Sequence, residues 1–304
     1  MGNTSKNVQP ELFTKTVRKD LGPGHLPVLS IANDYAECTV FLYGAHVASF
    51  KPRGAADVLF ISPHSLFVEG KPIRGGIPIC FPWFGKHSGW EDLFLHGLVR
   101  TQMWKLQEAT DEADGSTALV LRTCDDEYTR SVWPYRFSLQ LTISIAQTLK
   151  LVLQVTNADT QAFTFEEGFH TYLSIGSLRE CSVSNLDGCT AVDCADSNRE
   201  YVQTGPVTVS GEFVRIFSGI GPVVTLQDAA LRRSIHMEQQ NLKQVCIWNP
   251  GEVRALENPE VMEVWDTYLC VEHVNCHDGA LLLEPGGTHE SSIVFSVHPC
   301  DENK

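Results

Sequence analysis

The stretch Phe137-Ser-Leu-Gln-Leu-Thr-Ile-Ser-Ile145 alternates apolar and polar side chains without interruption. After a short turn, the stretch Leu149-Lys-Leu-Val-Leu-Gln-Val155 again places an apolar residue at every second position. A period of two is typical of a strand with one face in a core and the other toward water. The two stretches therefore predict an antiparallel β-hairpin.

Shorter runs of the same kind occur on both sides of this hairpin. They cover residues 28–31, 37–43, 45–50, 58–61, 104–108, 118–122, 163–175, 223–226, 245–248, 268–274 and 293–297. Amphipathic helical windows are scarce and short, which excludes a parallel sheet built with helical crossovers. The sequence predicts an all-β protein, a large antiparallel β-sandwich with a concave sheet face for a ligand.

No internal repeat and no linker rich in Gly, Ser or Pro divides the 304 residues. With 43% hydrophobic residues, the chain can bury a large core. We therefore expect a polar N-terminal lead at residues 1–25, one β-sandwich domain over residues 26–298, and a C-terminal tail at residues 299–304.

The formal net charge is −14. Nucleic acids and anionic membranes bind through clustered Lys and Arg, so this charge argues against both as partners. No apolar run is long enough to cross a bilayer, and residues 1–20 lack the apolar segment of a secretory signal. We expect a monomer in the cytoplasm, with import into an organelle left open.

Ten cysteines are scattered along the chain without a CxxC pair. A chain of this size needs no disulfides, so we expect reduced thiols that pack as small apolar groups. The densest run, Cys270-Val-Glu-His-Val-Asn-Cys276-His277, has metal-ligand residue types but not the usual zinc spacing. We expect no metal site.

An irregular connection over residues 62–100 stands out from the strands. It contains Arg74-Gly-Gly-Ile-Pro-Ile-Cys-Phe-Pro-Trp-Phe-Gly85 and Leu95-His-Gly-Leu-Val-Arg100. The paired glycines permit backbone dihedrals that are closed to other residues, and the two prolines stiffen the backbone after them. A long irregular segment with this many aromatic side chains indicates a functional site.

Arg74, His96 and Arg100 supply the polar groups of this connection. Arginine carries a forked donor that suits phosphate or carboxylate, although either arginine could instead pair with one of the 37 acidic residues. His96 could exchange a proton or hydrogen bond with a ligand, or lie on the surface. Trp83, Phe84 and Trp90 could form a flat wall for a sugar ring.

His170 and Glu272 lie in predicted strands. The strand phase of His170 groups it with Glu166 and Tyr172, a polar face that could be exposed to water or could line a hollow. Glu272 shares its phase with Tyr268, Cys270 and Val274. A carboxylate on such an apolar face is either paired with an arginine or has the raised pKa that a general base needs.

Several strings of residues together resemble the hexose-6-phosphate mutarotases, or glucose-6-phosphate 1-epimerases, within the aldose 1-epimerase group. The strings are Ile73-Arg-Gly-Gly-Ile-Pro-Ile-Cys-Phe-Pro-Trp-Phe-Gly85, His96-Gly-Leu-Val-Arg100, Phe169-His-Thr-Tyr-Leu173, Ser184-Asn-Leu186, Val245-Cys-Ile-Trp-Asn-Pro250 and Leu283-Glu-Pro-Gly286. The resemblance spans residues 26–298, and the first string is specific to the branch that acts on sugar phosphates.

The resemblance implies a galactose mutarotase-like β-sandwich that exchanges the α and β anomers of a hexose 6-phosphate without a cofactor. By motif, His170 would be the general acid and Glu272 the general base. The substrate would be bound by Arg74, Arg100, His96, Asp193 and an aromatic wall with Trp83. Two positions depart from the family: Leu95 replaces a frequent Gln or Ser, and His273 replaces the Pro that often follows the catalytic Glu, which affects the exit of that strand.

Two other functions remain open at this point. The chain could be a mutarotase for free aldoses, in which the arginines only form ion pairs, or a sugar-binding sandwich module without catalysis. A β-sandwich by itself does not separate these functions. A pure binding module has no use for an acid/base pair, and a neutral sugar does not require two arginines.

Overall fold

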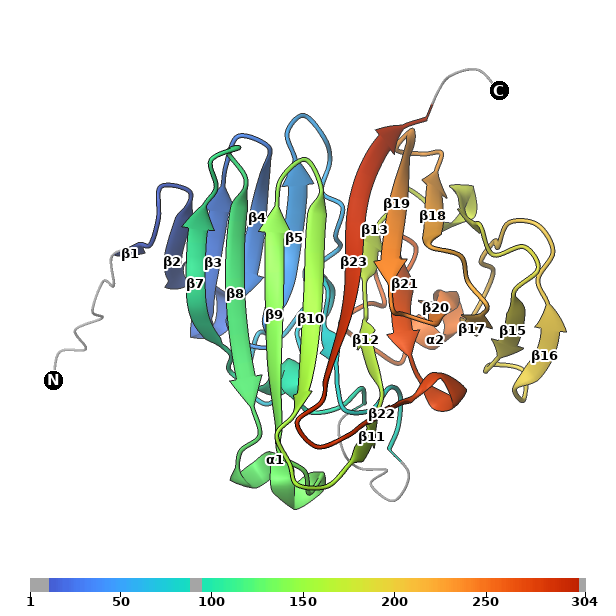
Figure 1. Cartoon of the computed structure of the whole chain (residues 1–304). Helices are drawn as coiled ribbons and strands as arrows, with labels where there is room; N and C mark the ends of the chain where they lie inside the picture. The colour runs from blue at the N-terminus through green and yellow to red at the C-terminus, as the bar shows by residue number, and fades with distance from the viewer. Residues whose placement is uncertain (1–10, 88–94, 301–304) are drawn as a thin grey trace, which may run out of the picture.

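The computed structural model describes residues 11–87 and 95–300. Figure 1 shows a molecule built almost entirely from antiparallel strands, which confirms the predicted all-β class. The described part of the chain contains two short α-helices, α1 (Glu127–Val132) and α2 (Gly251–Ala255). Turns of 3-10 helix cover Pro23–His25, Val99–Thr101, Leu178–Glu180 and His277–Gly279. No helix of the described residues is long and apolar enough to cross a membrane.

The N-terminal strands form one antiparallel sheet in chain order. They are β1 (Glu11–Leu12), β2 (Val17–Leu21), β3 (Pro27–Ala32), β4 (Ala36–Phe41) and β5 (His46–Pro52). β2 pairs with β3 along its whole length, and Val17 is fully buried. The segment 1–25, for which the sequence predicted only a polar lead, thus contributes two strands to the sheet.

The second sheet has the strand order β14-β18-β19-β23-β10-β9-β8-β7. These strands are β14 (Cys181–Ser184), β18 (Val223–Asp228), β19 (Arg233–Gln240), β23 (Thr288–Pro299), β10 (Leu149–Asn157), β9 (Phe137–Ile145), β8 (Thr117–Cys124) and β7 (Lys105–Asp111). The predicted hairpin is confirmed as β9 and β10, paired with Leu149 opposite Ile145. Every odd-numbered residue of β9 is buried, as its alternation requires.

The third sheet has the order β16-β15-β17-β20-β21-β12-β6, and β13 also pairs with β21. The strands are β16 (Arg199–Val202), β15 (Thr190–Asp193), β17 (Phe213–Ser218), β20 (Gln244–Asn249), β21 (Tyr268–Asn275), β12 (Glu167–Phe169), β6 (Ile79–Cys80) and β13 (Tyr172–Ser174). A small sheet pairs β11 (Phe163–Phe165) with β22 (Leu281–Leu283). The continuous strand predicted over 163–175 was wrong, because this segment is divided into β11, β12 and β13.

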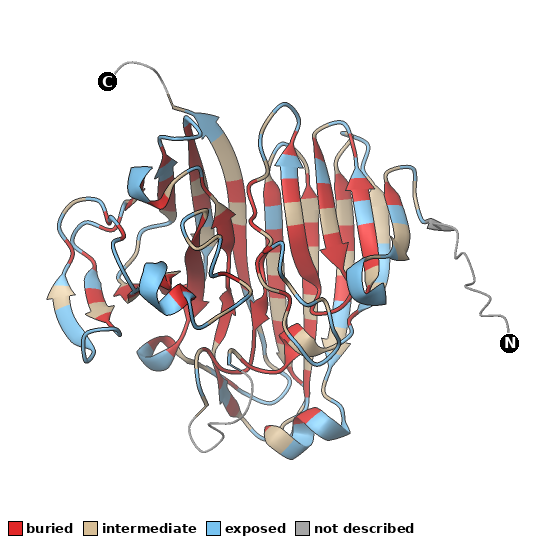
Figure 2. Ribbon diagram, turned by 180° about the vertical axis from the view of Figure 1, so that it is seen from behind, coloured by how far each residue is buried: buried red, intermediate tan, exposed pale blue. Residues whose placement is uncertain are grey.

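The sheets form two layers around one main core. In Figure 1 the second sheet lies in front of the other two, and isolated bridges such as Val47 with Ile77 join the five-stranded sheet to the sheet of β21. Side chains of both layers meet in the core, including Leu141 from the front and Val271 from the back. Figure 2 shows how buried and exposed residues alternate along the strands.

Gly75 and Gly76 adopt positive φ angles of 116° and 60° in the irregular connection. A Cβ on Gly75 would lie 2.3 Å from the carbonyl oxygen of Phe60, and a Cβ on Gly76 would lie equally close to that of Val47. Only glycine fits this path. The loop therefore packs closely against the back layer. This packing fixes the position of the backbone from which the Arg74 side chain extends.

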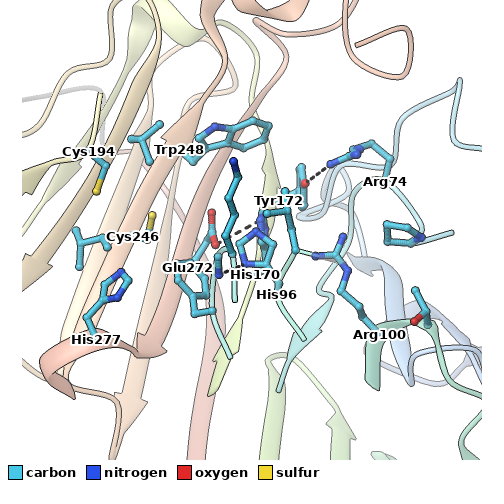
Figure 3. A pocket seen from close by; sticks show the side chains of 18 residues that line it. Arg74, His96, Arg100, His170, Tyr172, Cys194, Cys246, Trp248, Glu272 and His277 are labelled. Carbon is cyan, nitrogen blue, oxygen red and sulfur yellow. Dashed lines mark hydrogen bonds and ion pairs between the residues drawn. The ribbon is translucent and has the colours of Figure 1, made fainter. Parts of the chain in front are cut away.

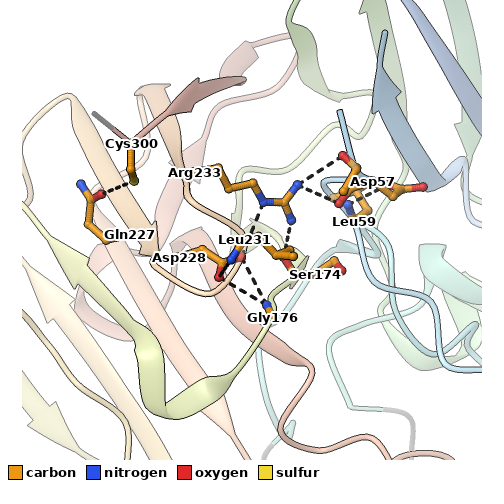
Figure 4. A network of polar contacts seen from close by, with 10 residues as sticks. Asp57, Leu59, Ser174, Gly176, Gln227, Asp228, Leu231, Arg233 and Cys300 are labelled. Carbon is orange, nitrogen blue, oxygen red and sulfur yellow. Dashed lines mark hydrogen bonds and ion pairs between the residues drawn. The ribbon is translucent and has the colours of Figure 1, made fainter. Parts of the chain in front are cut away.

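A buried arginine of the front layer forms hydrogen bonds with the back layer and its connections (Figure 4). Arg233, on β19 of the front layer, is 5% exposed. Its Nη1 donates to the carbonyl oxygens of Ala56 (3.2 Å) and Asp57 (3.0 Å), and its Nη2 donates to that of Ser174 on β13 (2.7 Å). Its Nε lies 3.6 Å from the buried carboxylate of Asp228, which is its cross-strand partner on β18.

His273 is a fully buried residue in the middle of β21, on the core side of the back layer. The expected change in strand exit after Glu272 is not seen, since β21 continues to Asn275. Neither ring nitrogen has a hydrogen-bond partner in the described structure. Burial lowers the pKa of His273 to about 3.

We expect His273 to make the protein sensitive to acid. The unfolded chain takes up a proton near pH 6.5, whereas the folded chain does so only near pH 3. Between these values the unfolded state binds more protons, so the free energy of unfolding falls as the pH falls below about 6.5. At pH 5 the loss from this residue is about 2 kcal/mol.

Urea unfolding at pH 8 and pH 5 measures this effect. The variant His273→Leu should lose about 2 kcal/mol less than the unmodified protein between the two pH values. His64→Leu provides the matched control, because His64 is exposed. Identical acid losses in the unmodified protein and in His273→Leu would contradict this explanation.

Candidate active site

A cavity of about 450 Å³ opens on the face of the back layer that points away from the core between the layers. Alternate residues of β20 and β21 face it: Cys246, Trp248 and Glu272 line the cavity, whereas Val245 and Val271 belong to the core. Figure 3 shows the side chains that converge here. The lining residues are Pro72, Arg74, Phe84, Gly85, Lys86, Leu95, His96, Arg100, Thr101, His170, Tyr172, Cys194, Val214, Ile216, Cys246, Trp248, Glu272 and His277.

Strand register brings His170 and Glu272 together. Phe169 pairs with His273 and Tyr172 pairs with Cys270, so the register against β21 is the same on both sides of the break between β12 and β13. Continuing that register places His170 opposite Glu272. Their atoms Nε2 and Oε2 are 3.4 Å apart, without hydrogen-bond geometry. Neither side chain is solvated: His170 is 5% exposed and Glu272 1%.

The surroundings of this pair shift both pKa values. Burial raises the pKa of Glu272 well above its ordinary value, and the charge of Arg100 only partly opposes this. Burial lowers the pKa of His170 well below its ordinary value, and the charges of His96, Arg100 and Arg74 lower it further. Burial thus disfavours the charged form of both residues. The sequence left open that Glu272 is paired with an arginine. In the described structure it forms no such ion pair, so this alternative does not apply.

Two aromatic rings hold the imidazole of His170. The Tyr172 ring is stacked on it, with centroids 4.9 Å apart and an interplanar angle of 12°. The His96 ring meets it edge-on at 4.8 Å. The Nδ1 of His96 accepts the N–H of Gly85 at 3.1 Å, so its Nε2 carries the proton when the ring is neutral. Burial and the charges of Arg100 and Arg74 lower the pKa of His96 and favour this neutral form.

Arg100 brings a buried positive charge to the cavity wall. It is 6% exposed, and its Nε and Nη1 have no hydrogen-bond acceptor among the residues that the structure describes. A buried guanidinium without an anion is costly. Because Arg100 lines the cavity, an anionic group of a ligand can accept hydrogen bonds from the forked N–H donors of its guanidinium group.

Arg74 also lines the cavity but already has partners. Its Nε and Nη2 both donate to Oε2 of Glu260 at 3.3 Å, and its Nη1 donates to the Tyr172 hydroxyl at 3.2 Å. The ion-pair alternative considered for the arginines thus describes Arg74 and not Arg100. Through Tyr172, Arg74 is connected to the ring that supports His170.

Of the remaining residues considered for the site, some line the cavity and others do not. Asp193 does not line the cavity, and its carboxylate accepts a hydrogen bond from Nε of Arg215 at 2.8 Å. Trp83 is packed in the main core, whereas its neighbour Phe84 faces the cavity. Leu95, at 50% exposure, lines the cavity without a polar group. Trp90 lies outside the described residues.

Sequence reasoning did not place Trp248 in the cavity and did not pair Glu260 with Arg74. Trp248 presents the indole wall that had been expected from Trp83. For Trp248, the strand pattern gave only one indication of this position: its residue number is even, in a strand whose odd-numbered residues are apolar. The approach of Glu260 to Arg74, from a loop 186 residues away along the chain, left no such signal.

All ten cysteines are free thiols, as expected. Cys246 and Cys194 line the cavity, whereas Cys270 lies beneath it, fully buried.

Comparisons with known proteins identify the family of this chain. The family model "Aldose 1-epimerase" matches residues 27–296. A protein of Escherichia coli (strain K12) with the name "Putative glucose-6-phosphate 1-epimerase" is 30% identical over 249 residues, which cover 81% of this chain and 82% of that protein.

Solved structures of other proteins superpose on this chain and identify its fold. A "putative mutarotase" from Salmonella typhimurium superposes with a TM-score of 0.88 at 25% identity, covering 95% of this chain and 96% of that chain. A "galactose mutarotase-like protein" from Clostridium acetobutylicum superposes with a TM-score of 0.77 at 14% identity, covering 94% and 100%, which is a likeness of fold alone. The expected galactose mutarotase-like sandwich is therefore confirmed, and the chain belongs to the aldose 1-epimerase family of sugar mutarotases.

Proposed function

We propose that this protein exchanges the α and β anomers of a hexose 6-phosphate, with glucose 6-phosphate as the substrate. The observation that carries the proposal is Arg100, a buried guanidinium with two unpartnered nitrogens in the same cavity as the His170 and Glu272 pair. A free aldose offers no charge to this arginine, whereas a phosphate offers several acceptor oxygens. The cavity volume of about 450 Å³ suits a ligand of this size.

Ring opening needs one group that removes the proton of the anomeric hydroxyl and one that protonates the ring oxygen. We assign the first role to Glu272 and the second to His170. During ring opening, Glu272 takes the proton of the anomeric hydroxyl and His170 gives its proton to the ring oxygen. Glu272 therefore becomes protonated and His170 becomes neutral. Burial shifts the pKa values of both residues in the direction of this state. After rotation about C1–C2, reclosure reverses both transfers.

A bound phosphate favours the protonated form of His170. His170 must carry a proton before ring opening, and the charges of Arg100 and Arg74 oppose this. A phosphate bound against these arginines offsets their charge and raises the pKa of His170. His96, as a neutral Nε2–H donor, can bind a sugar hydroxyl beside the pair. No step requires a metal or an organic cofactor.

The decisive experiment compares anomer exchange of glucose 6-phosphate and of glucose in Arg100→Ala. Loss of a charge-assisted contact of about 1.5 to 3 kcal/mol should lower kcat/KM for glucose 6-phosphate by roughly one to two orders of magnitude, mostly through KM. Exchange of glucose should barely change. Arg100→Lys should recover only part of the loss, because an ammonium lacks the fork.

Arg254→Ala is the matched control, since Arg254 lies on the surface with its side chain 57% exposed. It should leave both rates unchanged. Equal losses on both sugars in Arg100→Ala would show that this arginine shapes the cavity without binding a phosphate, and the free-aldose activity would then replace the proposal. Absence of exchange with either sugar in the unmodified protein would leave a sugar-binding module.

A further inference from the structure

A third side chain with metal-binding chemistry lies beside His170 and Glu272. Cys270 precedes Glu272 by two residues on β21, so the two share a face, and it is the cross-strand partner of Tyr172. One nitrogen of His170, the sulfur of Cys270 and one carboxylate oxygen of Glu272 all lie within 4.8 Å of one another. All three residues are buried. Strand β21 and the break between β12 and β13 thus bring an imidazole, a thiol and a carboxyl group to one point.

The geometry of this trio fits zinc closely. Zinc takes nitrogen and oxygen ligands at about 2.0 Å and sulfur at about 2.3 Å in a tetrahedral arrangement. In that arrangement a nitrogen and an oxygen ligand are about 3.3 Å apart. The observed separation of His170 Nε2 and Glu272 Oε2 is 3.4 Å. The sulfur of Cys270 lies within 4.8 Å of both atoms, so it needs to approach by at most about 1.3 Å to reach tetrahedral spacing.

The surroundings also favour an ion at this point. Oε2 of Glu272, the oxygen that faces His170, has no hydrogen-bond partner in the described structure. On binding zinc, the thiol and the carboxyl group release their protons to water, and their two negative charges balance the ion. No net charge is added near Arg100. His170 and Glu272 line the cavity, which provides an entry path and room for a fourth ligand.

We propose that His170, Cys270 and Glu272 bind one zinc ion, and that zinc inhibits the enzyme reversibly because it occupies both proton-transfer groups. The ion is an inhibitor and takes no part in anomer exchange. Its binding is independent of the proposed hexose-phosphate activity, and only the inhibition rests on that activity. The spacing of Cys270, Cys276 and His277 along the chain did not indicate this site, because the histidine ligand comes from the break between β12 and β13, far from β21 in the chain.

Binding is tested with Co²⁺ as a spectroscopic substitute for zinc in the full-length protein. The unmodified protein should bind one Co²⁺ and show the near-ultraviolet charge-transfer band of a thiolate ligand, and added Zn²⁺ should remove the band. Cys270→Ser should lose the band and bind Co²⁺ at least about tenfold more weakly. Cys246→Ser, which changes a neighbouring thiol that lines the cavity, should keep it.

Absence of the band in the unmodified protein, or an unchanged band in Cys270→Ser, would overturn the proposed site. A band lost only in Cys246→Ser would assign the thiolate to that residue and would equally overturn it.

Inhibition is tested by anomer exchange of the preferred sugar with increasing Zn²⁺. The unmodified protein should lose activity and regain it with EDTA. Cys270→Ser should keep the basal rate, because Cys270 does not line the cavity, and should need at least about tenfold more Zn²⁺ for half-inhibition. Equal sensitivity of both proteins would refute inhibition through this site. If the unmodified protein exchanges no anomers, the proposed function fails, and the Co²⁺ spectra still decide whether the metal site exists.

Discussion

Glu272→Gln is expected to lower kcat for anomer exchange by roughly 10² to 10⁴, the usual contribution of one positioned proton-transfer group. This loss corresponds to about 3 to 5 kcal/mol of transition-state stabilisation. Glutamine keeps the size and shape of the side chain but cannot accept the proton of the anomeric hydroxyl. Because burial already favours the neutral form of Glu272, the fold and substrate binding should be retained.

The measurement is anomer exchange of glucose 6-phosphate followed by NMR, with KM from the same data and a thermal melt as a test of folding. Glu238→Gln makes the same change at an exposed position of β19 and should leave the rate and the melting temperature unchanged. A wild-type rate in Glu272→Gln would remove this residue from the mechanism.

His170→Asn should be similarly slow. The two residues are 3.4 Å apart and line the same cavity, so we expect them to serve one transition state. The double variant with Glu272→Gln should therefore be much less damaged than the product of the two single losses. Fully multiplicative losses would place the two residues in separate steps.

Arg233→Met is expected to lower the free energy of unfolding by about 3 to 5 kcal/mol. The change leaves the carboxylate of Asp228 buried without its cation and removes the donors to the carbonyl oxygens of Ala56, Asp57 and Ser174. These carbonyls belong to the back layer and its connections, so the loss weakens the contact between the layers. Urea unfolding at pH 8 measures it.

Arg122→Met makes the same substitution at an exposed residue of β8 and should stay within about 0.5 kcal/mol of the unmodified protein. The double variant with Asp228→Asn should lose less than the sum of the two single variants, since it leaves no unpaired buried charge. A loss below about 1 kcal/mol in Arg233→Met would show that the contact between the layers does not depend on this network.

Local periodicity was sufficient for the fold class. The alternation over residues 137–155 identified which residues of β9 and β10 face the core, because the side chains of a strand alternate between its two faces whatever the strand packs against. The irregular connection was recognisable for a local reason as well. Its glycines permit unusual backbone dihedrals and its prolines stiffen the backbone, and the structure places Arg74, His96 and Arg100 on the wall of one cavity.

Alternation shows which residues share a face, but not what covers that face. The phase of His170 was compatible with solvent, and only the cavity wall formed by β20, β21 and the irregular connection makes it a buried partner of Glu272. The same limit explains Trp83, whose aromatic character does not reveal that it faces the core while Phe84 faces the cavity.

Pairing between distant segments was decided by the tertiary structure alone. The ion pair of Arg74 with Glu260, that of Asp193 with Arg215, and the layer contact of Arg233 join positions far apart in the chain. The sequence determined that the protein is an antiparallel sandwich and that Arg74 and Arg100 belong to one irregular loop, and it predicted His170 and Glu272 as an acid/base pair. Strand register and layer packing decided which arginine has nitrogens without an acceptor among the described residues, and which thiol lies beside His170 and Glu272. They set the distances between side chains that no local pattern relates.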